Sequence, residues 1–168
     1  MPYENTSVDS MKSWSEICSI LYAHGCKGTA YTEAPGTGFQ IEFVRDVRGK
    51  SILVRVPVAY DLAPEKDRYG HVKQKTPAQI EQEKRTKWRS LFYWIKAQFD
   101  AIDKGIVAYE EAFLAGIVGH LSDGRTGRVI DVMPGLAQGR LSEVKLLPDP
   151  DRDDREELVV DYQAETVK

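Results

Sequence analysis

Long hydrophobic runs are missing from this sequence. No stretch of about eighteen or more apolar residues occurs, so we expect no membrane-spanning segment. The N-terminal residues MPYENTSVDS lack the basic and apolar regions of a signal peptide, which favours an intracellular, cytoplasmic protein.

Cysteine is scarce as well. Cys18 and Cys26 are expected to be free thiols in a reducing compartment. Together with His24 they form the start of a zinc-ligand pattern, but no C-x-x-C pair and no H-x-x-x-H pair completes a tetrahedral set. The spacing therefore favours a protein without a metal ion.

Motifs for nucleotide binding or catalysis are not recognisable either. Gly36 and Gly38 are not followed by the third glycine and the helix of a dinucleotide fingerprint, and no G-x-x-x-x-G-K-[ST] loop occurs. His24, His71 and His120 fall in different predicted segments, so spacing implies no acid–base pair. The sequence favours a non-enzymatic protein without a cofactor; an enzyme whose histidines converge in space is left open.

What the sequence does contain is unevenly distributed charge. The composition, 42% hydrophobic and 29% charged, is that of a globular protein, and the net charge of the 168 residues is only −3. Residues 66–96 nevertheless carry 9 Lys/Arg against 3 Asp/Glu, whereas residues 97–168 carry 8 against 15. Such polarisation is an argument about partners rather than about the fold.

The first part of the chain predicts one helix and three strands. Ser13 and Glu16 have capping-box spacing, and apolar residues then recur at helical intervals as far as Gly25, which predicts a helix over 13–24. Alternating apolar residues and turn-forming linkers predict an antiparallel meander of three strands. The strands are expected at residues 28–32, 39–45 and 51–58.

A long connection and a long helix follow. Residues 59–75 are polar and aperiodic, which is typical of a functional or mobile loop. Thr76, Pro77 and Gln79 then predict a helix start, and Gly105 the helix end. A shorter helix over 108–118 is expected to fold back onto the long one. The core-facing stripe of the long helix is predicted to comprise Trp88, Leu91, Phe92, Ile95, Phe99 and Ile102.

These elements define an α+β fold. It contains an N-terminal helix, a three-stranded antiparallel sheet, a long helix across the sheet and a short return helix. We expect residues 1–120 to form a single domain. Residues 121–168 are expected to form an irregular, partly disordered acidic extension that includes the charge run PDPDRDDREE at 148–157.

The basic segment suggests that the protein binds nucleic acid. Phosphates are neutralised by clustered Lys and Arg, and single strands are held by aromatic stacking. The hypothesis requires the positive charges to gather into one solvent-facing patch; the alternative is an ordinary charged helix surface. The predicted nucleic-acid-binding residues are Arg68, Tyr69, Lys73, Lys75, Lys84, Arg85, Lys87, Arg89 and Tyr93.

Residues 13–118 resemble a group of small uncharacterised proteins encoded in phage and prophage genomes. The stretches WSEICSILYAHGC and KWRSLFYWIKAQFDAIDKGIVAYEEAFLAGIV carry the resemblance. It implies the fold and a phage-related accessory protein acting in the host cytoplasm, and it implies no activity. The helix-strand-strand-strand-helix order is also similar to that of double-stranded RNA-binding domains, but those have a short link before the second helix where this chain has residues 59–75.

A protein partner is the alternative function. A host or phage protein, as for a regulator, inhibitor or anti-defence factor, would be bound through the long loop, the acidic tail, or the aromatics Tyr93 and Trp94. A simpler expectation for Trp94 is that it packs under the return helix. A homodimer through the long helix is a further alternative.

Overall fold

The computed structural model describes residues 6–34, 36–66, 68–69, 71–121, 124–138, 143–146 and 159–161. The first half of the chain forms α1 (Ser10–Ala23), β1 (Cys26–Ala34), β2 (Gly38–Val47), β3 (Lys50–Ala59), β4 (Glu65–Lys66) and β5 (Val72–Lys73). The second half forms α2 (Pro77–Asp103), α3 (Tyr109–Phe113), the 3₁₀ turn η1 (Leu114–Gly116), β6 (Val118–Leu121), β7 (Thr126–Arg128), α4 (Val129–Ala137), β8 (Glu143–Leu146) and β9 (Val159–Asp161). The predicted α+β class is confirmed.

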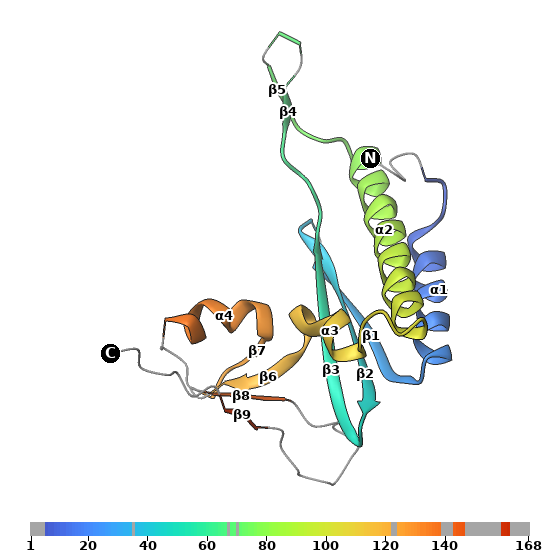
Figure 1. Cartoon of the computed structure of the whole chain (residues 1–168). Helices are drawn as coiled ribbons and strands as arrows, with labels where there is room; N and C mark the ends of the chain where they lie inside the picture. The colour runs from blue at the N-terminus through green and yellow to red at the C-terminus, as the bar shows by residue number, and fades with distance from the viewer. Residues whose placement is uncertain are drawn as a thin grey trace.

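The central unit is an antiparallel sheet in the order β1-β2-β3, with α1 and α2 packed side by side against it (Figure 1). Alternate residues of β2, Phe39, Ile41 and Phe43, are buried in the same core as the apolar sides of both helices. Both helices therefore cover one face of the sheet. Each large apolar side chain buried in this way contributes about 1.5–3 kcal/mol relative to an exposed one.

The long helix matches its prediction closely. Thr76 accepts from the Gln79 backbone N–H at 3.3 Å, the Gln79 side chain accepts from the Thr76 N–H at 2.8 Å, and Pro77 occupies the first turn. Four residues of the predicted stripe are buried, whereas Phe92 and Ile102 are only partly buried. The buried residues are Trp88, Leu91, Ile95 and Phe99.

The predicted start of the first helix was wrong by one turn. Asp9 caps α1 by accepting from the Met11 N–H at 2.8 Å, so the helix begins at Ser10. Ser13, which the sequence suggested as the cap, lies on the core side and is fully buried. Asp9 and Ser13 are both residues that can cap a helix. Because Ser13 lies on the helix face that packs into the core, Asp9 occupies the cap position instead.

The return helix is shorter than predicted. α3 ends at Phe113, and the chain then passes close to β3, where Ile117 forms a bridge with Val54. A Cβ on Gly116 would lie 2.9 Å from the Arg55 carbonyl oxygen, so the close approach depends on this glycine. Pairing with the edge of β3 ends the helical segment before the predicted residue 118.

The extension beyond residue 120 contains structure that the sequence did not predict. Its described part adds α4 and a second antiparallel sheet in the order β7-β6-β8-β9. β6 crosses the predicted domain boundary at residues 120 and 121. The acidic run at 148–157 lies outside the described residues.

Candidate nucleic-acid interface

A hairpin projects from the body of the protein between β3 and α2 (Figure 1). It lies in the segment that the sequence identified as a long loop, and β4 and β5 pair antiparallel in it. We call residues 61–75 the arm. The arm carries four predicted site residues: Arg68, Tyr69, Lys73 and Lys75.

The outer part of the arm presents cations and rings to solvent. Tyr69 is 68% exposed and Val72 is 62% exposed, and Arg68, His71 and Lys73 are exposed as well. The Arg68 guanidinium lies 4.6 Å from the centre of the Tyr69 ring and donates to its hydroxyl, and the Tyr69 and His71 rings are 6.3 Å apart. This grouping of positive charge with ring faces is what phosphates and unpaired bases bind.

The arm is fixed to the body at its root. Tyr60 is buried, and its hydroxyl donates to Glu33 at 3.3 Å. Burial, together with the neighbouring Glu33 charge, raises the pKa of Tyr60, so its hydroxyl stays protonated. The Asp61 N–H donates to Glu83 of α2 at 3.0 Å, and the Lys75 ammonium donates to the Asp61 carbonyl oxygen. The arm therefore leaves the body from a defined point.

The predicted cations of α2 differ from those of the arm, because each is paired with a carboxylate. The contacts are Lys84 with Glu33 (2.7 Å), Arg85 with Glu81 (3.3 Å), Lys87 with Glu83 (3.6 Å) and Arg89 with Glu16. Ion pairs at a surface are worth only about 0–1 kcal/mol, so a phosphate can compete for them. It must, however, displace a carboxylate at every one of these positions.

The α2 cations also point to different sides of the helix. Lys84 reaches Glu33 on β1, whereas Arg89 reaches Glu16 on α1. The structure therefore divides the predicted residues between the arm and two flanks of α2. It does not gather them into the single patch that the sequence hypothesis required.

The aromatic residues of α2 are held by contacts within the protein. The Arg89 guanidinium lies 4.2 Å from the Phe92 ring centre and 4.8 Å from that of Tyr93, and it donates to the Tyr93 hydroxyl at 3.2 Å. Trp94 packs edge-on against Phe113 of α3 with ring centres 5.8 Å apart, as expected for packing under the return helix. These contacts leave Tyr93 a poorer stacking platform than Tyr69.

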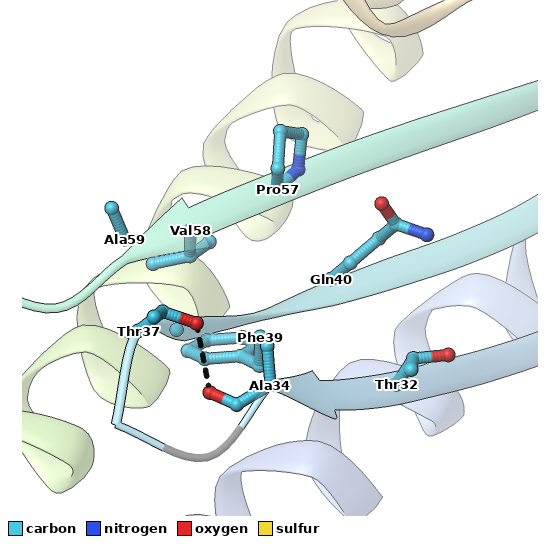
Figure 2. Close-up of a pocket in the computed structure, with 9 residues that line it drawn as sticks. Thr32, Ala34, Thr37, Phe39, Gln40, Pro57, Val58 and Ala59 are labelled. Carbon is cyan, nitrogen blue, oxygen red and sulfur yellow. Dashed lines mark hydrogen bonds between the residues drawn. The ribbon is translucent and has the colours of Figure 1, made fainter.

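A shallow hollow of about 320 Å³ lies at the root of the arm (Figure 2). It occupies the sheet face that α1 and α2 leave open, and we call it the root hollow. Two cross-strand rows from β1, β2 and β3 form most of its lining: Thr32, Gln40 and Pro57, and Ala34, Gly38 and Ala59. No expectation drawn from the sequence included this hollow, although the small residues at both ends of the β1–β2 turn were a visible signal.

The three histidines do not meet. The ring nitrogens of His24 lie 2.7 Å from the Ile20 carbonyl oxygen and 3.0 Å from an Asp103 carboxylate oxygen, which ties the ends of α1 and α2 together. His71 lies on the arm and His120 on β6. Each histidine therefore belongs to a different part of the fold.

Both cysteines are free thiols, and Cys26 is buried. Burial raises the pKa of Cys26 to about 11 despite the nearby Arg45 charge, so the thiol is protonated at neutral pH. Among the described residues, no three His, Cys, Asp or Glu side chains are grouped so that they could hold a metal ion.

No helix in the described ranges has the length and apolar character that crossing a membrane requires. No protein-family model matches this chain, and no curated protein or solved structure matches it either. The phage-related origin implied by the resemblance stays a prediction.

Proposed function

We propose that this protein binds nucleic acid as a non-enzymatic accessory protein, and that the arm makes the main contacts. One observation carries the proposal. The arm extends away from the body and exposes Arg68, Tyr69, His71 and Lys73 together, whereas the cations of α2 are paired with carboxylates.

The chemistry of the arm suits a polyanion that carries flat bases. Arg68 and Lys73 neutralise phosphates, and Tyr69 supplies an exposed face on which a base stacks. The attachment through Tyr60 and Asp61 fixes the point at which the arm leaves the body, beside the sheet. The same strand can therefore touch the arm and the sheet surface at its root.

The experiment compares two charge-matched double variants by fluorescence anisotropy with labelled DNA and RNA. Arg68→Ala with Lys73→Ala removes two exposed cations, and we expect the Kd to rise about tenfold or more at low salt. Arg85→Ala with Lys87→Ala removes two cations that are paired within α2, and we expect a change below about threefold. Equal effects of the two variants, or no binding by the unmodified protein, would contradict the proposal.

A protein partner is the second candidate, and the apolar end of the arm favours it. Tyr69 and Val72 are both more than half exposed, and exposed tyrosine is enriched at the hot spots of protein interfaces. Affinity capture from a host lysate after nuclease treatment separates the two candidates. A protein that is retained through the arm in the absence of nucleic acid supports this second function.

A further inference from the structure

We infer that the root hollow receives an unstacked base of a single-stranded nucleic acid, and that Gln40 selects bases carrying an exocyclic amino group. The inference rests on the proposed function and names the ligand class of the same site. It follows from the construction of the hollow, the orientation of Gln40 and the position of the hollow beside the arm.

The hollow exists because one row of the sheet has almost no side chains. Ala34, Gly38 and Ala59 lie opposite one another on β1, β2 and β3. A Cβ at Gly38 would lie 2.2 Å from the Val58 carbonyl oxygen, so no larger residue fits between the strands. The row therefore contributes only two methyl groups, and it forms a flat apolar floor.

The neighbouring row forms a wall beside this floor. Thr32, Gln40 and Pro57 lie opposite one another and point from the same face, away from the helices behind the sheet (Figure 2). Thr32 and Pro57 are exposed, so the wall is accessible from solvent. A planar ring laid on the floor gains apolar contact on one face and meets polar atoms at its edge.

Gln40 is held in a defined orientation by the next row of the sheet. Its amide nitrogen donates to Glu42 at 3.0 Å, and Arg55 donates to the same carboxylate oxygen at 2.6 Å. One of the two N–H groups of the amide is thus engaged, which places the nitrogen on the Glu42 side, and we infer that the carbonyl oxygen acts as the acceptor toward the hollow. An acceptor fixed opposite position 4 of a pyrimidine or position 6 of adenine favours cytosine and adenine, which carry an amino group there, over uracil and thymine, which carry an oxygen at position 4.

We expect the occupant of the hollow to be a nucleic-acid base because the hollow lies beside the arm. β3 ends at Ala59, which lines the hollow, and the arm begins at Asp61. Tyr60 between them is fixed by its N–H, which donates to the Thr37 carbonyl oxygen at 2.9 Å at the rim of the hollow. A strand whose phosphates contact the arm therefore passes over the hollow. A duplex keeps its base edges paired, so only a single strand can place a base there.

The test uses anisotropy with oligo-dC and oligo-dU of about twelve nucleotides, a length typical of single-strand sites. Cytosine and uracil differ at position 4, where one has an amino group and the other an oxygen. We expect the full chain to bind oligo-dC at least about fivefold more tightly than oligo-dU. Oligo-rC and oligo-rU are measured in parallel to distinguish DNA from RNA, and a duplex of the same length should bind more weakly than oligo-dC.

Two variants of the hollow sharpen this test. Gln40→Met keeps the size of the side chain and removes the acceptor, so the preference for cytosine should fall to within about twofold while oligo-dU binding is unchanged. Ala59→Leu fills the floor at an exposed position, and it should weaken single-strand binding about fivefold or more without affecting the duplex. Thermal unfolding of both variants checks that they fold.

The outcomes separate this inference from the proposed function. Equal affinity for oligo-dC and oligo-dU, or a preference that survives in Gln40→Met, overturns the inference. If the Arg68→Ala, Lys73→Ala variant nevertheless loses affinity, the proposed function stands without it. Absence of any nucleic-acid binding overturns both.

Discussion

At the level of single residues, the surroundings of each cation determine what it can bind. Arg89 lies over two rings and contacts Glu16, so moving it to a phosphate breaks several contacts at once. Arg68 lies over the ring of its neighbour Tyr69 and donates to its hydroxyl. A cation that stacks on an exposed ring keeps its outward side available for an anion.

Some of these pairings were readable from the sequence, and others were not. Glu81 and Glu83 stand four residues before Arg85 and Lys87, a spacing that predicts ion pairs along a helix. The partner of Lys84, in contrast, lies on β1, and that of Arg89 lies on α1. Contacts between residues so far apart in the chain depend on the tertiary fold, and no local pattern specifies them.

The buried thiol of Cys26 leads to a prediction about pH. Its pKa is about 11 in the folded protein, against an ordinary value of 9.0. The unfolded chain therefore loses the thiol proton first, and the stability conferred by the neutral thiol is complete below pH 9 and is lost as pH rises toward 11. Urea unfolding at these two pH values should show a loss of about 2 kcal/mol from this group.

The control for this prediction is Cys26→Ala. Other groups, including the buried Tyr109, also titrate at high pH, and they remain in the variant. Its free energy of unfolding should therefore decline less steeply than that of the unmodified protein over the same range. Identical slopes in the two proteins would show that the thiol does not contribute.

At the scale of elements, the sequence predicted a helix or strand correctly where residues within that element determine its structure. The cap of α2 and the alternation in β2 and β3 are both encoded within a few residues. The end of α3 was not predictable in this way, because it depends on the pairing of Ile117 with Val54. The arm escaped prediction because each of its strands has only two residues, too few for a periodic pattern.

The capping box of α2 provides a stability prediction for this element. Thr76→Ala removes the side-chain acceptor at the first turn, and we expect a loss of about 1 kcal/mol in the free energy of unfolding. Ser90→Ala, which removes an exposed hydroxyl from the same helix, should change it by less than about 0.5 kcal/mol. Chemical denaturation followed by circular dichroism measures both, and equal effects would argue against the cap.

At the scale of the whole molecule, the fold separates a packed body from a projecting arm. The core is shared by α1, α2, α3 and the β1-β2-β3 sheet, and the second sheet approaches the edge of β3 near Val54. Leu62 at the root of the arm packs against this core, whereas Arg68, Tyr69 and Lys73 of the outer arm do not belong to it. The arm residues that we propose for recognition are therefore not needed for packing of the body.

The root of the arm joins these two parts. Tyr60 is the last core residue before the arm, and the root hollow lies directly beside it on the open face of the sheet. A ligand strand held by the arm would therefore meet a surface of the sheet rather than a second loop. In the binding mode that we propose, the body would supply selectivity and the arm most of the attraction.

The most direct test of the central claim is the salt dependence of nucleic-acid affinity in the full chain and in a variant whose residues 64–73 are replaced by a short Gly-Ser link. Because each phosphate contact contributes about 0.7–0.9 to the slope of log affinity against log salt, loss of the arm should lower the slope by about two. The Tm of this variant should stay within a few degrees of that of the full chain if the body folds without the arm. A slope that is the same with and without the arm would contradict the account.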